Sequence, residues 1–294
     1  MSFWKSRQAS GIFLIILTAL FFASLDTAAK RATQTVPLLM LLWFRYTFQA
    51  LVTLALRFPV QKTGIFVTPN PRFQVLRGAL LLVSSACAFF GLQYLPVAEF
   101  TAIGMLSPMA ATAMAAWMLK THVSRQRWAL MCIGLLGVLL VVRPGGQVFN
   151  WGLVFPLGMV ASYAWFQVLT SRLSADENPY TTHFYTGLIG SLLMTPFMLH
   201  SWDSDALLNY WYWFVLVGSL GTFAHLMLIR AFDRAKAVVL VPYLYTQIAF
   251  ATLLGWIVFR HVPDGLAWAG IAVIAASGAG NAVLSSREVS AQRQ

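Results

Sequence analysis

Charged residues are scarce in this sequence: Asp, Glu, Lys and Arg make up 10% of its 294 residues, and only 9 are acidic. Hydrophobic residues make up 59%, and the mean hydropathy is +0.71. A soluble domain of this length does not show such values. We therefore predict a membrane protein.

Cysteine is also scarce, with two residues in the chain. Cys87 and Cys132 both lie within apolar runs, where a free cysteine behaves as a small hydrophobic residue. We predict no disulfide, no metal site and no cofactor.

The net charge of +11 could indicate nucleic-acid binding, which requires basic residues clustered on one polar face. Here the basic residues lie in short groups between apolar runs. They are typical of loops on one side of a bilayer, and we expect a lipid bilayer and a small-molecule substrate as partners, with no nucleic acid.

The apolar runs predict ten spans of roughly 20 residues each, at about 10–30, 36–57, 75–95, 98–119, 126–143, 152–172, 180–199, 211–232, 237–259 and 265–285. The basic start followed by GIFLIILTALFFASL is also typical of a cleavable signal peptide. The continuation LDTAAKRA favours a helix end, so we interpret this run as the first span.

The distribution of Lys and Arg predicts the orientation of the chain. With the N-terminus inside, fourteen of the 20 basic residues fall on the inner side, Arg45 and Arg230 fall within spans, and four fall outside, namely Lys30, Arg31, Arg143 and Arg260. Both termini are therefore predicted to be cytoplasmic.

The chain also contains an internal repeat. The pattern W-x4-H-V occurs at Trp117 and again at Trp256, 139 residues later, and closes the fourth and the ninth span. The preceding stretches PVAEFTAIG and DRAKAVVLV match in kind. Each half, residues 1–148 and 149–294, then holds five spans, and an odd number gives the halves opposite orientations. The predicted fold is an all-α membrane protein of ten helices in two inverted five-helix repeats.

Several stretches resemble the drug/metabolite transporter superfamily of ten-helix permeases with paired EamA-type domains. They are FRYTFQA around Arg45, residues 76–108, residues 125–145 and HLMLIRAFDRAKAVVLVPYLYTQIAFATLLGWIVF from His225. Within the superfamily the sequence is similar to bacterial S-adenosylmethionine and riboflavin uptake permeases. The family often has a glutamate after the fourth and ninth spans, whereas this chain has Lys120-Thr121-His122 and Arg260-His261.

Polar residues within the spans are the candidate site, because an ionisable group at membrane depth needs a partner or water. Arg45, Gln49 and Thr53 recur at four-residue steps and share one face of a helix. Arg45 is either a cavity guanidinium for an anionic or carbonyl group of the substrate, or a structural clamp.

Three further residues are candidates for coupling or for balancing charge. Asp26 is a counter-ion, a proton-coupling carboxylate or an i,i+4 partner of Lys30. Glu99 either has one of these roles or stabilises the start of its helix. His225 matches a histidine position of the resembled family and suits substrate binding or proton coupling, or else is a satisfied helix residue.

Aromatic and amide side chains complete the expected substrate site, although interhelical hydrogen bonding explains them as well. They are Tyr94, Tyr163, Trp165, Gln167, Tyr243, Tyr245 and Gln247. His183 is interpreted as a packing residue, and Arg77 and Arg230 as residues near inner helix ends that snorkel or anchor loops. We expect Arg45, His225, Tyr243 and Gln247 to converge on one chamber.

We predict a secondary transporter in a bacterial inner membrane, a monomer or weak homodimer. It would move a small organic metabolite, of amino-acid, nucleoside, flavin or S-adenosylmethionine type, by alternating access. One alternative is a drug or metabolite exporter driven by proton antiport. Another is an intramembrane enzyme, but no H-E-x-x-H or equivalent cluster is present. A pore or receptor would need a polar ring or a ligand-binding domain, and neither is evident.

Overall fold

The computed structural model describes residues 2–119, 123–142, 151–173, 177–235, 240 and 243–291. Every element in this part of the chain is helical. In order, the elements are α1 (Ser2–Ala32), α2 (Leu38–Gln61), the 3-10 helix η1 (Lys62–Phe66), α3 (Pro71–Tyr94), α4 (Val97–Gly104), α5 (Ser107–Leu119), α6 (Arg125–Val142), the 3-10 helix η2 (Trp151–Leu153), α7 (Val154–Leu173), α8 (Pro179–His200), α9 (Ser204–Phe232), α11 (Thr246–Phe259) and α12 (Gly265–Ala291).

Local signals explain where several helices begin. The side chains of Asn178, Asp203 and Asp264 accept hydrogen bonds from backbone N–H groups two or three residues later, at 2.8 to 3.0 Å. Such caps satisfy N–H groups that have no partner inside the helix. The helices α8, α9 and α12 therefore begin at positions that the sequence encodes locally.

Each predicted span overlaps at least one helix. Seven helical segments within the described residues are long and apolar enough to cross a membrane, and α11 is a shorter apolar helix. Between 33% and 50% of their most apolar windows is buried, so the remainder faces outward, as expected for helices that contact lipid on one side. The chain is a multi-pass membrane protein, and the count of ten spans stays a prediction.

The fourth predicted span is not one continuous helix. The first part, α4, ends at Gly104, a turn follows at Met105 and Leu106, and α5 begins at Ser107. Pro108 lies at the start of α5 and has no N–H group to donate to a preceding turn. At this break, side chains bond the backbone carbonyls: Ser107 Oγ donates to the Gly104 carbonyl, and Tyr245 Oη donates to the Met105 carbonyl.

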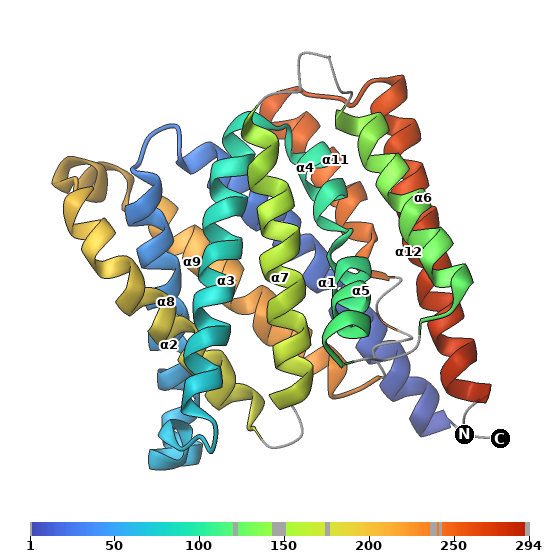
Figure 1. Cartoon of the computed structure of the whole chain (residues 1–294). Coiled ribbons are helices and arrows are strands. Elements are labelled where there is room, and N and C mark those ends of the chain that lie inside the picture. Colours follow the sequence, from blue (N-terminus) through green and yellow to red (C-terminus); the bar gives the residue numbers. More distant parts are fainter. Residues whose placement is uncertain are drawn as a thin grey trace.

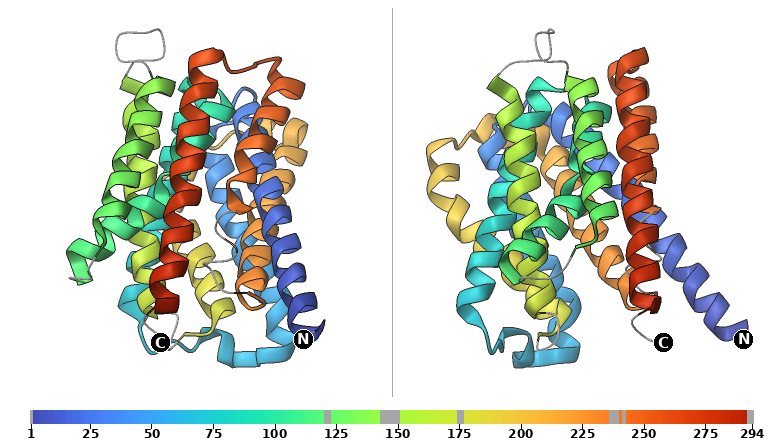
Figure 2. Two further views of the ribbon diagram at one scale, coloured as in Figure 1. Left: turned by 90° about the vertical axis from the view of Figure 1, so that its right-hand side faces the viewer. Right: turned by 45° about the vertical axis from the view of Figure 1, so that its right-hand side comes forward.

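The helices run roughly side by side through the bundle (Figures 1 and 2). The main pairings are α2 with α8 and α9, α6 with α12, α1 with α9 and α11, α3 with α7 and α8, α4 with α11, and α5 with α7. Because α1 begins and α12 ends at the same end of the bundle, we call it the terminal end and the opposite one the remote end (Figure 1).

The pair α6 and α12 is in contact through glycine. A Cβ atom added at Gly270 would lie 2.5 Å from the Gly137 carbonyl oxygen, and one added at Gly137 would lie 2.9 Å from the Gly270 carbonyl oxygen. Small residues let membrane helices approach closely enough for van der Waals packing. Gly137 and Gly270 therefore act as packing residues between α6 and α12.

We expect Gly270→Ala to lower stability by about 1–3 kcal/mol, because the methyl group would overlap backbone that must then shift. Unfolding of the purified protein in detergent measures this. Gly255→Ala is the matched control, since a Cβ there meets nothing within 4 Å. Equal stability of the two variants would contradict the packing argument.

Candidate functional site

A cavity of about 590 Å³ lies within the bundle. Its walls come from α1, α2, α3, α4, α5, α7, α9, α11 and the segment before α11. The polar side chains that line it are Asp26, Arg45, Ser84, Ser85, Thr101, Ser107, Tyr163, Gln167, Thr170, Ser171, His225 and Gln247. Phe22, Phe89, Phe100, Phe166 and Phe232 add aromatic walls.

The cavity reaches from the middle of the bundle toward the terminal end. Ser171 and Phe232, which line it, lie in the last turns of α7 and α9. Both helices end at the terminal end (Figure 1). On the opposite side the lining stops at Phe100 and Thr101 in α4, one turn from the remote end of that helix.

Arg45 is a buried cation at this cavity, 4% exposed. Its Nη1 donates to Ser85 Oγ at 2.8 Å, and its Cζ lies 4.9 Å from the centroid of the Tyr46 ring. The Nε atom is buried and has no hydrogen-bond partner. One N–H group of the guanidinium is therefore unsatisfied, and an unpaired donor is costly at this depth.

A glycine on the facing helix makes room for this guanidinium. A Cβ atom added at Gly221 of α9 would lie 3.0 Å from Arg45 Nε. The backbone carbonyl of the same Gly221 bonds His225 one turn later. One short stretch of α9 thus accommodates both candidate side chains, Arg45 and His225.

Two histidines, His183 and His225, lie near Arg45, with ring centroids 6.1 Å apart. Thr53 Oγ1 donates its single hydrogen to the Gln49 carbonyl at 2.6 Å, so it must accept from His183 Nδ1 at 2.7 Å. His225 Nδ1 likewise donates to the Gly221 carbonyl at 2.9 Å. In the neutral form both rings therefore carry the proton on Nδ1, and each Nε2 is an acceptor.

The two Nε2 acceptors differ in their surroundings. His225 lines the cavity, whereas the Nε2 atom of His183 is buried without a hydrogen-bond partner. The interpretation of His183 as a packing residue therefore accounts for its bonded Nδ1 but not for its buried, unpartnered Nε2.

Asp26 provides the opposite charge in the same cavity. Its Oδ2 accepts a hydrogen bond of 3.4 Å from Gln247 Nε2, which joins α1 to α11. Asp26 and Arg45 interact electrostatically across the cavity. The site thus presents one acidic and one basic side chain to a ligand.

The structure places the other candidate residues in several surroundings. Tyr163 and Gln167 line the cavity, and Gln49 lies behind it, donating to the His183 carbonyl at 3.0 Å. Tyr94, Trp165 and Tyr243 are not among the lining residues and are 50%, 42% and 37% exposed. The expected convergence therefore includes Arg45, His225 and Gln247 but not Tyr243.

Tyr245 and Glu99 also lie outside the cavity. Tyr245 Oη donates to the Met105 carbonyl at 3.3 Å, at the break between α4 and α5. Glu99 is buried in the first turn of α4 and bonds His261. His122 lies outside the described residues.

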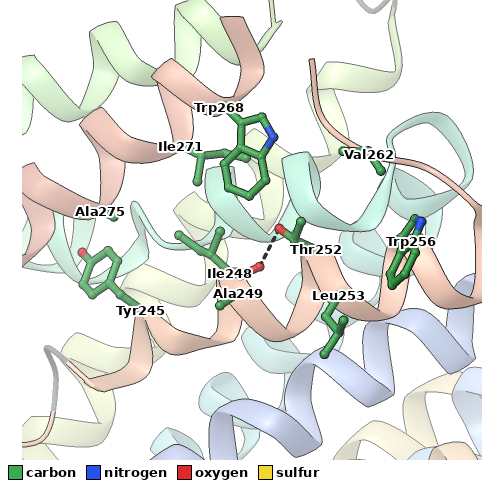
Figure 3. Close-up of a pocket in the computed structure, with 10 residues that line it drawn as sticks. All are labelled: Tyr245, Ile248, Ala249, Thr252, Leu253, Trp256, Val262, Trp268, Ile271 and Ala275. Carbon is green, nitrogen blue, oxygen red and sulfur yellow. Dashed lines mark hydrogen bonds between the residues drawn. The ribbon is translucent and has the colours of Figure 1, made fainter. Parts of the chain in front are cut away.

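Tyr245 also lines a second hollow, of about 510 Å³, between α11 and α12 (Figure 3). Its walls are almost entirely apolar, and Leu253, Trp256 and Trp268 are partly exposed there. An apolar surface of this kind suits contact with lipid rather than a polar metabolite.

The sequence interpretation of Arg77 needs correction. Its side chain is 7% exposed and does not snorkel. Its Nε donates to Thr170 Oγ1 at 2.7 Å, and its Nη1 donates to the Thr182 carbonyl and Thr186 Oγ1 at 3.1 and 2.8 Å. Arg77 joins α3 to α7 and α8, because hydroxyl and carbonyl groups at this depth offer the acceptors that a snorkelling side chain would seek in water.

Sequence reasoning also missed the short hydroxyl residues of the cavity, Ser84, Ser85, Thr101 and Ser107. A serine or threonine within an apolar run is equally typical of helix packing. One local signal was available at Ser107, since the following Pro108 interrupts the span.

The profile of the EamA-like transporter family matches residues 9–143 and 150–281. The chain belongs to the EamA-like transporter family. Transport rather than enzymatic activity is therefore the class of function, and the resemblance to the drug/metabolite transporter superfamily is confirmed.

Curated relatives carry transporter names. The chain is 24% identical over 222 residues to an S-adenosylmethionine uptake transporter of Rickettsia prowazekii, covering 76% of this chain and 75% of the relative. It is 26% identical to a pseudopaline exporter of Pseudomonas aeruginosa, covering 89% and 92%. It is also 26% identical to a riboflavin transporter of Vibrio cholerae, covering 93% of each.

A solved crystal structure matches the fold with a TM-score of 0.67, at 19% identity, over 96% of this chain and 99% of the other. At this level of identity the match shows the fold alone.

We expect Arg77→Lys to destabilise the protein by about 1–3 kcal/mol, because lysine keeps the charge but loses the fork that bonds three acceptors. Thermal unfolding in detergent measures the loss. Arg72→Lys, at an exposed position on the same helix, is the control. An Arg77→Lys protein as stable as the control would show that these bonds contribute little.

Proposed function

We propose that the chain is a secondary transporter that moves a small organic metabolite across the bacterial inner membrane by alternating access. One observation carries the proposal: a cavity in the bundle holds Asp26 and Arg45, two opposite charges, and reaches toward the terminal end. An ionisable residue at such depth is costly, and a substrate pathway is the usual reason that it is retained.

The lining residues support a substrate with both polar and flat apolar parts. Arg45 lines the cavity as a guanidinium that can donate to a carboxylate, phosphate or carbonyl oxygen. Asp26 and the His225 Nε2 accept from amine, amide or hydroxyl groups. The phenylalanines, with Tyr163, offer faces for a ring. Amino-acid, nucleoside, flavin and S-adenosylmethionine types all fit this description, and the names of the relatives fall within the same range.

Two inverted repeats would provide the alternating movement. The main packing pairs support this arrangement. They are unchanged when α1, α2, α3, α4–α5 and α6 are exchanged for α7, α8, α9, α11 and α12 in order. The contact of α1 with α9 becomes that of α7 with α3, and the contact of α1 with α11 becomes that of α7 with α4 and α5.

A proton-coupled exporter is the second candidate. Asp26 is an acid that lines the cavity and accepts a hydrogen bond of 3.4 Å from Gln247, so a substrate and a proton could compete for it. The pseudopaline exporter is a relative with this direction of transport in its name. We expect a monomer or weak homodimer in either case.

Uptake into proteoliposomes tests the function. We expect Arg45→Lys to reduce transport of the recognised substrate at least tenfold while the protein still folds, because the substrate's oxygen atoms lose a planar donor. S-adenosylmethionine, riboflavin and amino acids are the first probes, chosen by a thermal-shift screen.

Arg31→Lys, at an exposed position near the end of α1, is the matched control. A stable Arg45→Lys protein with normal transport would remove Arg45 from the substrate site. A variant that unfolds would instead assign Arg45 the clamp role.

Topology gives a separate prediction. The terminal end should face the cytoplasm, because the basic residues concentrate there. We expect cysteine tags at Ser2 and Gln294 to resist an impermeant reagent in intact cells and to react in inside-out vesicles. Labelling of either tag in intact cells would refute the orientation.

A further inference from the structure

An ion pair joins two distant parts of the chain at the remote end of the bundle. His261 Nε2 lies 2.9 Å from Glu99 Oε1. Glu99 lies in the first turn of α4, and His261 follows the end of α11. The pair therefore links the two stretches that match the family profile. A carboxylate oxygen accepts, and His261 Nε2 therefore carries the proton in this contact.

The backbone at the end of α11 aims His261 at α4. Arg260 has a φ of 56°, in the left-handed region that a non-glycine residue rarely adopts. Its N–H bonds the Trp256 carbonyl at 2.9 Å, and the His261 N–H bonds the Gly255 carbonyl at 3.3 Å. This helix-ending motif reverses the chain and fixes the position of the imidazole.

Among the described residues, His261 is the hydrogen-bond partner of the Glu99 carboxylate. The Glu99 side chain is buried, and its second oxygen, Oε2, has no hydrogen-bond partner. The nearby cation Lys30 instead donates to the carbonyls of Leu92 and Leu95, at 2.7 and 2.5 Å, and so joins α1 to the end of α3. Lys30 interacts with Glu99 electrostatically but makes no hydrogen bond to it.

The pair lies directly above the cavity on its closed side. Phe100 and Thr101, the residues after Glu99, line the cavity. Because α4 contacts α11, separation of these two helices would open a path from the cavity to the remote end. Separation of α4 and α11 at this point breaks the contact between Glu99 and His261.

We propose that Glu99 and His261 form a latch that holds the cavity shut at the remote end and opens when the cavity faces that side. The proposal rests on transport by alternating access. It assigns Glu99 a gating role in place of a coupling or counter-ion role. Since the side chain of His261 is 40% exposed, water can solvate it once the pair separates.

Labelling of a cysteine in the cavity tests the latch without any substrate. Cys87 and Cys132 are replaced by alanine, and Ala88→Cys places a reporter among the lining residues. An impermeant thiol reagent is applied to the remote face of reconstituted protein. We expect Glu99→Ala and His261→Ala each to raise the labelling rate about tenfold, the shift that loss of one charge-assisted hydrogen bond produces.

The double variant should label no faster than the single variants, since each alone breaks the same contact. Asp205→Ala, which removes an exposed acid from the first turn of α9, is the control and should leave the rate unchanged. His261→Ala alters a partly exposed side chain and so tests the proposal even where Glu99→Ala fails to fold. Unchanged labelling from the remote face in a folded His261→Ala protein would overturn the latch.

Cross-linking gives the opposite perturbation. In the same background, Glu99→Cys with His261→Cys should be joined by a short bifunctional thiol reagent. We expect labelling of Ala88→Cys from the terminal face to persist and labelling from the remote face to fall to background, reversibly for a reducible linker. Remote-face labelling that survives complete cross-linking would overturn the latch. Failure of every variant and of the parent to transport would count against the proposed function alone, because labelling needs no turnover.

Discussion

A buried guanidinium sets the organisation of this bundle. Arg45 lies among apolar helices, where an unpaired charge is too costly to keep without compensation. Ser85 and the Tyr46 ring satisfy part of it, Gly221 makes room for it, and the acidic Asp26 lies in the same cavity. The cavity is therefore the place where the polar groups of α1, α2, α3 and α9 must face one another.

The sequence located the residues whose polarity is conspicuous in an apolar run. The assignment to the interior was possible for Asp26, Arg45, His225 and Gln247, because a polar side chain within an apolar span is costly when it faces lipid. Tyr94 and Trp165 could not be placed in this way, because an aromatic ring is stable at a lipid-facing surface as well. The hydroxyls of Ser84 and Thr101 give the same signal as packing residues. The contact of Glu99 with His261 joins positions 162 residues apart, which no local pattern can predict.

The two buried arginines show why burial alone does not identify a site. Arg77 uses its donors on three acceptors from two neighbouring helices, so it has little left for a ligand. Arg45 has one hydrogen bond to a side chain and a buried Nε without a partner. A saturated guanidinium stabilises the fold, whereas an unsaturated one at a cavity can bind. The sequence alone does not distinguish these two cases, because Arg45 and Arg77 both appear in it as an arginine in an apolar run.

The proposed repeat also bears on which side the cavity faces. Glu99 in PVAEFTAIG corresponds to Lys236 in DRAKAVVLV, and His261 corresponds to His122. Lys236 and His122 lie outside the described residues, but by residue type alone a lysine and a histidine cannot form an ion pair. In the proposed repeat, the first half thus carries the acid needed for a latch at the remote end, and the second half has no acid at the matching place. Unequal charge at equivalent positions favours closure at the remote end, in agreement with a cavity that reaches toward the terminal end.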